Sequence, residues 1–300
     1  MDKGIFDFHA DDFALSLSSS QDIQTLGCKG AIESISIIPN MSAFDQAIPL
    51  AETLPQNIKR SIHLNFMEGK SCLDRADVPA LVDDNGFFKV SWGSLLLASY
   101  NPFRRNILRR QLSNEIEVQV EKCIASGLAE PKAIRLDSHQ HTHMIPLVQD
   151  ALFDAIDRLE KGGRKVVFVR NTEDPVMLYL RTRGALQGFS PVNIIKCLIL
   201  NLFSIRLKAT LAKRNLPIGY LCGVFYSGHM DDEHLNRVLP AFEARARKES
   251  RTVEVLFHPG SVKKEEILPE FNKPGFVTFH LSKNRHIEFN ALCKLSGVSI

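Results

Sequence analysis

The segment AIRLDSHQHTH, Ala133 to His143, joins a short apolar run to a carboxylate and three histidines. Its first four residues are typical of a β-strand, and Met144-Ile145-Pro146 introduces a helical segment. Asp137 to His143 is therefore predicted to lie at the C-terminal end of a strand, where α/β folds place their catalytic groups. Imidazoles packed this densely favour a divalent-metal site over a role in the core, and we expect the remaining ligands elsewhere in the chain.

Around this segment, strand-like and helix-like runs alternate. The expected strands cover residues 4–9, 34–38, 61–66, 133–136, 165–169, 223–227 and 253–257. The expected helices cover residues 16–28, 43–54, 113–125, 147–160 and 231–248. Such alternation indicates parallel β/α units, and no repeat or low-complexity linker divides the chain. We therefore predict an α/β fold with a single domain over residues 1–300.

Two segments interrupt the alternation. Residues 69–112 are irregular, contain the only tryptophan, and are predicted to form a long excursion or lid. Residues 175–222 form a basic apolar insertion without Asp or Glu, and its apolar run Ile194 to Ile205 is too short to span a bilayer. Two interpretations stay open: peripheral contact with an anionic membrane surface, or a buried helix with a solvated basic edge at a homodimer interface.

Composition narrows the class of protein. The chain has 300 residues, of which 44% are hydrophobic and 24% charged, as in ordinary globular proteins. A net charge of +3 is too small to indicate nucleic acid as a partner. The N-terminus enters a strand-like run without an apolar signal region, and the six cysteines are scattered. We expect a cytoplasmic protein, peripheral on the inner face of the membrane if the insertion contacts lipid.

Ionisable residues follow four of the expected strands. These are Asp11-Asp12, His63, the segment Asp137 to His143, and His258-Pro259-Gly260. In a β/α barrel all four would converge on one rim. A carboxylate and two imidazoles are a typical ligand set for an open zinc site, where the cation polarises a carbonyl or phosphoryl oxygen. Each piece alone also fits a cap or a core histidine, but four at successive strand ends favour a catalytic site.

These blocks resemble a known family. ADDFALS (residues 10–16), HLN (63–65), DSHQHTH with the later Pro146, and HPG (258–260) are similar to the YdjC-like carbohydrate deacetylase family. That family includes chito-oligosaccharide deacetylases and a hopanoid-cluster branch, and the order and spacing of the blocks agree along nearly the whole chain. The resemblance implies an irregular (β/α) barrel of the glycoside hydrolase/deacetylase type.

The resemblance also implies roles for individual residues. Asp12, His63 and His139 would be the metal ligands, for Zn²⁺ or Mg²⁺. Asp11 would be the general base, and His258 the general acid that protonates the leaving amine. Residues expected to contact substrate or to orient the ligands are His9, Asp137, His141, His143 and Arg170. His9 and Ala14 depart from the family's Asn and Gly, and Ala14 disfavours the left-handed backbone that Gly adopts easily.

The sequence thus predicts a metal-dependent hydrolase, a carbohydrate N-deacetylase. Its substrate would be an N-acetylhexosamine in an oligosaccharide or a lipid-linked sugar, with acetate as a product. One alternative is a metal-dependent phosphoesterase on the same rim, which would use two metals with His141 or His143 as additional ligands. The other is a catalytically inactive protein that binds glycan or a membrane surface.

Overall fold

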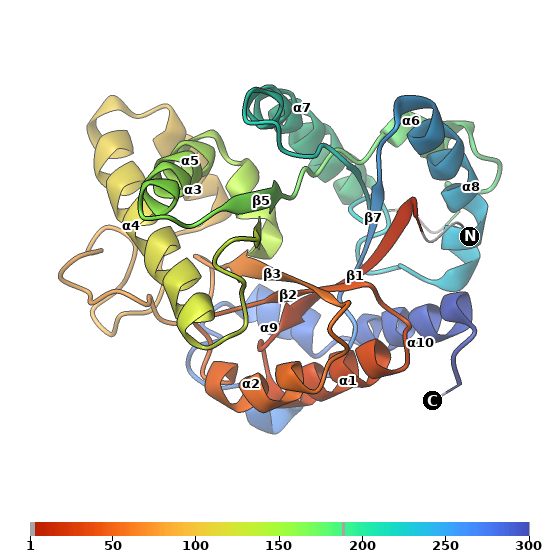
Figure 1. Cartoon of the computed structure of the whole chain (residues 1–300), viewed down its shortest axis with the longest axis horizontal. Coiled ribbons are helices and arrows are strands. Elements are labelled where there is room, and N and C mark those ends of the chain that lie inside the picture. Colours follow the sequence, from red (N-terminus) through yellow and green to blue (C-terminus); the bar gives the residue numbers. More distant parts are fainter. Residues whose placement is uncertain (1–3, 188–189, 300) are drawn as a thin grey trace.

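The computed structural model describes residues 4–187 and 190–299. Within them, seven parallel strands form a curled sheet in the order β5-β4-β3-β2-β1-β7-β6, a half-barrel that is open between β5 and β6 (Figure 1). The strands are β1 Phe6–Phe13, β2 Ser34–Ile37, β3 Lys59–Leu64, β4 Ile134–Ser138, β5 Val166–Val169, β6 Tyr220–Cys222 and β7 Val253–Phe257. The expected irregular (β/α) barrel is confirmed in this open form.

Helices surround the sheet. They are α1 Leu17–Cys28, α2 Phe44–Glu52, α3 Trp92–Ser99, α4 Pro102–Ala125, α5 Pro146–Lys161, α6 Val176–Arg181, α7 Pro191–Lys213, α8 Asp232–Glu249, α9 Pro274–His280 and α10 Asn284–Ser296. Two 3₁₀ turns, η1 His139–Met144 and η2 Lys264–Glu266, complete the order. In Figure 1, α1 and α2 run along the lower side, and α3, α5 and α7 lie at the top.

Strand pairing brings the predicted site residues to neighbouring positions. β1 lies between β2 and β7, and Ala10 pairs with Ile35 on one side and Phe257 on the other. His63 of β3 pairs with Asp137 of β4. Because the sheet is parallel, the carboxyl ends of these strands share one edge. β1 runs to Phe13 rather than ending at residue 9, so Asp11 and Asp12 belong to the strand itself.

The strand expected over residues 223–227 is wrong. The strand here is β6, which ends at Cys222. Oδ2 of the buried Asp174 accepts the backbone N–H groups of Gly223, Val224 and Phe225, at 3.3, 2.9 and 3.0 Å. Because this carboxylate takes the donors that a sheet ladder would use, the chain turns instead.

The start expected at residue 113 for the helix over residues 113–125 is wrong, because the helix begins within the expected excursion over residues 69–112. Helix α4 begins at Pro102, eleven residues before the expected start at 113. Asn101 caps it by accepting the N–H groups of Phe103 and Arg104, and proline suits the first helical turn. The single domain stays a prediction, and residues 1–3, 188–189 and 300 of its expected range lie outside the described part.

Candidate metal centre and active site

The end of β1 has an unusual backbone. Asp12 and Ala14 both have φ of 68°, in the left-handed region. Ala14 therefore adopts the conformation that its side chain was expected to disfavour. Its N–H donates to Ser20 Oγ at 2.9 Å, and Leu15 N–H donates to the Asp12 carbonyl at 3.1 Å. Such a backbone costs about 1–2 kcal/mol per non-glycine residue, and strain of this kind is concentrated at functional sites.

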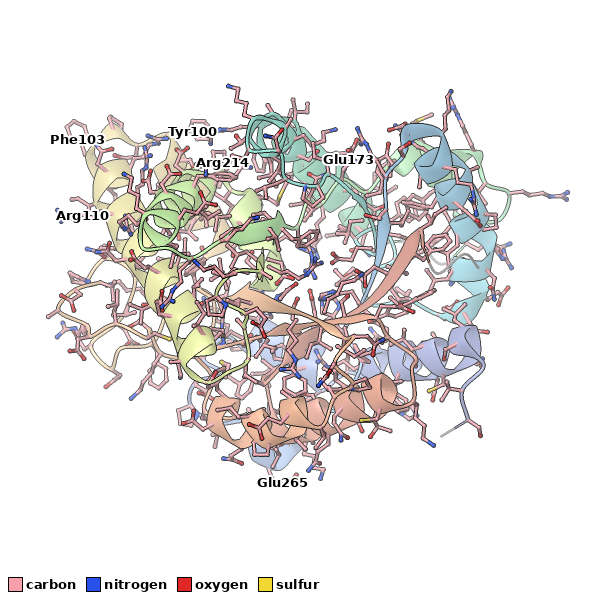
Figure 2. The ribbon with its side chains drawn as sticks, viewed as in Figure 1. Tyr100, Phe103, Arg110, Glu173, Arg214 and Glu265 are labelled. Carbon is pink, nitrogen blue, oxygen red and sulfur yellow. The ribbon has the colours of Figure 1, made fainter. Side chains whose placement is uncertain are left out.

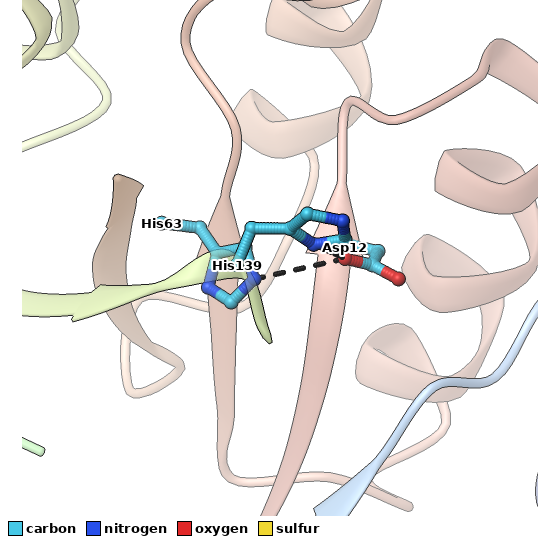
Figure 3. Close-up of side chains that lie close together, drawn as sticks. All are labelled: Asp12, His63 and His139. Carbon is cyan, nitrogen blue, oxygen red and sulfur yellow. Dashed lines mark hydrogen bonds and ion pairs between the residues drawn. The ribbon is translucent and has the colours of Figure 1, made fainter. Parts of the chain in front are cut away.

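Asp12, His63 and His139 meet at the carboxyl ends of β1, β3 and β4. Their ligand atoms lie within 4.8 Å of one another, and all three residues are buried (Figure 3). His139 Nδ1 lies 3.1 Å and His63 Nε2 3.6 Å from Asp12 Oδ1. One oxygen and two imidazole nitrogens at these spacings fit a divalent cation bound at about 2.0–2.2 Å from each ligand atom.

Two further side chains hold this donor set in place. Asp137 Oδ1 accepts from His63 Nδ1 at 2.6 Å, which leaves His63 Nε2 facing Asp12. Arg285 Nη1 donates to Asp12 Oδ2 at 2.9 Å, which leaves Oδ1 facing the two imidazoles. A carboxylate behind a histidine is the usual arrangement for fixing the orientation of a metal-binding imidazole. Asp137 therefore lies where it can orient His63.

A second group shares His139. Glu68 Oε2 lies 3.1 Å from His139 Nε2 and 2.9 Å from His280 Nε2, and all three residues are buried. Burial disfavours the imidazolium, but the carboxylates of Asp12 and Glu68 on either side raise the pKa of His139 to about 10. Burial likewise disfavours the Glu68 carboxylate, yet hydrogen bonds from His139 and His280 lower its pKa to about 2.

Asp11 lies beside the donor set and is held by Arg170. The guanidinium donates to both carboxylate oxygens, Nη1 to Oδ2 at 2.9 Å and Nη2 to Oδ1 at 2.8 Å. Burial would raise the pKa of Asp11, but Arg170 and His63 hold it well below its usual range. Arg170 also forms ion pairs with Asp137 at 3.0 Å and Glu254 at 2.5 Å. Asp11 is therefore ionised and fixed in orientation.

His9 lies behind Asp11. Its Nε2 is 3.1 Å from Asp11 Oδ1 and 2.6 Å from Ser36 Oγ, and its Nδ1 is 2.6 Å from Ser34 Oγ. The ring is completely buried. The structure thus places His9 as a support for Asp11 and the β2 serines.

The three histidines after β4 have different surroundings. His143 Nε2 donates to the Arg170 carbonyl at 2.9 Å, and its Nδ1 lies 2.6 Å from Ser138 Oγ. Burial lowers the pKa of His143 to about 4, so the ring is neutral. His141 is half-buried on left-handed backbone, and burial together with Arg170 holds its pKa well below the usual value. Of the three, His139 joins the metal-compatible groups of the described residues.

His258 reaches the same region from β7. Its side chain is 22% exposed, and its Nε2 lies 3.9 Å from Asp11 Oδ2. Glu288 of α10 accepts the His258 backbone N–H, and its Oε2 lies 3.8 Å from His258 Nδ1. Burial disfavours the imidazolium, but Glu288, Asp12 and Asp11 outweigh it and raise the pKa of His258.

Glycine at position 260 follows from close packing against α1. Gly260 has φ of 95°, and a Cβ there would lie 2.8 Å from the Ser19 carbonyl oxygen. The His-Pro-Gly sequence therefore lets the loop after β7 approach α1 closely enough for His258 to face Asp11.

Four further residues that contact the site were not predicted from the sequence. They are Glu68, His280, Arg285 and Glu288. Glu68 follows β3 within four residues, so its position after a strand was a usable signal. The other three lie on α9 and α10, where no local pattern indicates that the helices fold back to the sheet edge.

Comparison with known proteins gives a consistent result. The model of the YdjC-like protein family matches residues 8–296. A carbohydrate deacetylase of Vibrio cholerae is 29% identical over 149 residues, which cover 49% of this chain and 53% of that protein. One of Geobacillus stearothermophilus is 31% identical over 156 residues, which cover 52% and 56%. The match thus spans about half the length of these curated relatives.

A solved structure supports the fold. A protein of Enterococcus faecalis, described as a candidate for cellobiose-phosphate cleavage, superimposes with a TM-score of 0.64 over 98% of this chain and 95% of its own. The two are 17% identical in sequence, so the likeness concerns the fold. Since the family model covers all four ionisable strand ends, this chain belongs to the YdjC-like family.

Proposed function

We propose that the protein is a metal-dependent carbohydrate N-deacetylase. It removes the acetyl group from an N-acetylhexosamine of an oligosaccharide or lipid-linked sugar and releases acetate. The observation that carries this proposal is the Asp12, His63 and His139 donor set with Asp11 and His258 beside it. The curated relatives named carbohydrate deacetylase support the substrate class. We place the protein in the cytoplasm.

Asp12, His63 and His139 would hold the cation. Their mixed oxygen and nitrogen donors suit Zn²⁺ and also accept Mg²⁺. A divalent cation supplies polarisation of the acetyl carbonyl and acidification of the attacking water. The chain's contribution here is an oriented donor set, because Asp137 and Arg285 fix His63 and Asp12 from outside.

Asp11 would take the proton from the attacking water. Its low pKa keeps it ionised, so it can accept a proton at neutral pH. Oδ1 is engaged by both Arg170 and His9, whereas Oδ2 accepts from Arg170 Nη1 and keeps a second lone pair with which to accept the proton. Arg170 thus fixes the base in one orientation while it remains able to act.

His258 would protonate the departing amine. Amide hydrolysis needs an acid at the leaving nitrogen, and the carboxylates of Glu288, Asp12 and Asp11 raise the pKa of His258, which favours the protonated ring that an acid requires. The partly exposed side chain can reach a substrate that lies against Asp11. Base and acid would therefore act from β1 and β7, two paired strands.

The phosphoesterase remains a second candidate because one observation favours it. Glu68, His139 and His280 form a further group able to bind a cation, as a two-metal site would require. The ligands differ from those expected, since both nitrogens of His143 are bonded to Ser138 and Arg170. Metal content per chain separates the candidates: one equivalent supports the deacetylase, and two support the phosphoesterase.

Acetate release from N-acetylglucosamine and N-acetylgalactosamine donors, free and lipid-linked, tests the proposal. We expect Asp11→Asn and His258→Ala to lose turnover by about 10²–10⁴-fold, the usual contribution of acid–base catalysis, while still binding the cation. His286→Ala, an exposed histidine on α10, is the control and should keep wild-type turnover. Turnover near wild type in both site variants, with metal bound, would show that the assigned roles are wrong.

A further inference from the structure

Large apolar side chains project into solvent from two neighbouring parts of the molecule. At the corner between α3 and α4, Leu97, Tyr100 and Phe103 are 72–86% exposed. Along α7, Ile195, Leu198, Leu202 and Ile205 are 55–62% exposed and recur every three or four residues, so they form one stripe. We call these seven side chains the apolar face. Soluble proteins seldom expose so many clustered apolar residues without a binding role.

The corner and the stripe lie side by side. The Trp92 ring of α3 stacks on Phe203 of α7 with centroids 6.1 Å apart. Arg105 of α4 and Arg206 of α7 both form ion pairs with Asp150 of α5, which lies between them. Figure 1 shows α3, α5 and α7 together at the top of the molecule, and Figure 2 labels Tyr100 and Phe103 at its upper left.

The charges around the apolar face that no ion pair engages are basic, because Asp150 and Asp154 of α5 are paired with arginines of α4 and α7. Residues 85–114, which include the corner, contain no Asp or Glu, and neither do residues 175–230, which include the stripe. Arg104, Arg110 and Lys196 are exposed, and no ion pair engages them within residues 4–187 and 190–299. The two acid-free stretches of the chain thus meet on one surface, which is apolar with unpaired basic residues at its edges.

We propose that the apolar face docks on the surface of an anionic phospholipid bilayer. Leucine, isoleucine and aromatic side chains enter the headgroup–acyl boundary, while basic residues bind anionic headgroups. None of the described helices is long and apolar enough to cross a bilayer, so the contact is peripheral. A second copy fits less well, because a two-fold interface would bring Arg104, Arg110 and Lys196 against their own kind.

The docked face adjoins the candidate metal centre. Gln149 of α5 donates to the Met144 carbonyl of η1 at 2.9 Å and to the Phe203 carbonyl of α7 at 3.3 Å. Helix α7, whose outer side carries the stripe, therefore packs directly behind the turn that contains His139. This step alone rests on the proposed function: docking would favour an N-acetylated sugar held on a lipid over a free oligosaccharide.

Vesicle co-sedimentation tests the docking without any activity assay. We expect the full chain to bind vesicles of phosphatidylcholine with phosphatidylglycerol and not vesicles of phosphatidylcholine alone. Leu198→Glu/Leu202→Glu should lose binding, and Arg104→Gln/Arg110→Gln should weaken it about 30-fold, because each basic residue near an anionic surface contributes roughly one factor of five. These four side chains are exposed, so the variants should fold.

The matched control places the same two charges elsewhere. Leu268 and Ile287 are 44% and 40% exposed, and Leu268→Glu/Ile287→Glu should bind vesicles as the wild type does. Leu268 is three residues from Glu265, which lies at the bottom of Figure 2, away from Tyr100 and Phe103. Absence of vesicle binding, or binding that all variants retain, would overturn the proposal. So would a wild-type dimer in sedimentation velocity that Leu198→Glu/Leu202→Glu converts to monomer without any vesicle binding.

Discussion

The two sides of the His139 ring carry similar groups in different arrangements. On the Nδ1 side, Asp12 and His63 are each held from outside, by Arg285 and Asp137. On the Nε2 side, Glu68 accepts hydrogen bonds from both His139 and His280. On both sides a carboxylate oxygen lies 3.1 Å from a nitrogen of His139, so the internal pairing is the same. The difference is the support from outside, because Arg285 and Asp137 hold Asp12 and His63, whereas Glu68 Oε1 and His280 Nδ1 have no hydrogen-bond partner among the described residues. We therefore propose that the first side holds the cation and that the second orients His139.

Two atoms argue for the opposite assignment. Glu68 Oε1 and His280 Nδ1 are buried and have no hydrogen-bond partner among the described residues. Unpaired buried polar atoms cost free energy unless something else satisfies them, and a cation would do so for Glu68. Measurement of cation binding by variants of each side therefore determines which side of His139 binds the cation.

The largest effect is expected on the Asp12 side, which we propose holds the cation. Asp12→Asn and His139→Ala should lose the metal, because the first removes the negative charge of the donor set and the second removes a ligand nitrogen. Glu68→Gln should weaken binding only about 10–100-fold, the usual effect of changing a residue behind a ligand. Metal content after gel filtration and calorimetric titration with Zn²⁺ measure both.

Asp137→Asn serves as the matched control for Glu68→Gln. It alters the carboxylate behind His63 in the same way, so the two variants should weaken binding similarly. The assignment of the two sides would be reversed if Glu68→Gln lost the metal while Asp12→Asn kept it. Circular dichroism confirms that each variant is folded before its affinity is interpreted.

The sequence predicted the strand ends of this site because their signals are local. Asp12, His63 and His139 each follow a short apolar run, and parallel strands bring such positions to one edge. The same logic failed at residues 223–227, where Asp174, fifty residues away, captures the backbone donors. The hydrophobic periodicity of a segment does not show that a carboxylate far away in the sequence will accept its backbone N–H groups.

Arg285 and Glu288 illustrate what periodicity could not indicate. Both lie on α10. Arg285 bonds to Asp12, 273 residues away in the sequence, and Glu288 bonds to His258, 30 residues away. Both are buried charges, and only the return of the C-terminal helices to the sheet edge gives them partners. No helix after residue 248 is predicted from the sequence, so these two residues have no predicted surroundings.

A smaller effect, on the pH dependence of activity, is expected from changing Glu288, which lies beside His258. A general acid must be protonated, so activity should fall as the pH rises through the pKa of His258. Glu288 raises that pKa, and Glu288→Gln keeps an oxygen for the His258 backbone N–H but removes the charge. The alkaline limb of kcat/KM should therefore move to lower pH, while metal content stays the same.

Glu265→Gln is the control, because Glu265 is exposed and lies outside the site. Its pH profile should match that of the wild type. If the alkaline limb of kcat/KM in Glu288→Gln were unchanged, His258 would not be the general acid. A profile that changes together with metal content would instead show that Glu288 acts through the fold of the site.

The smallest effect on the cation is expected from His143, four residues beyond His139. His143→Ala should bind metal as the wild type does, because both ring nitrogens bond to Ser138 and the Arg170 carbonyl and neither faces the cation. Its free energy of unfolding should fall by about 1–3 kcal/mol, since these buried partners are left unpaired. Denaturant titration and metal analysis of one preparation measure the two quantities together. Loss of metal by a folded His143→Ala protein would contradict this prediction. His143 would then have to be counted among the metal ligands.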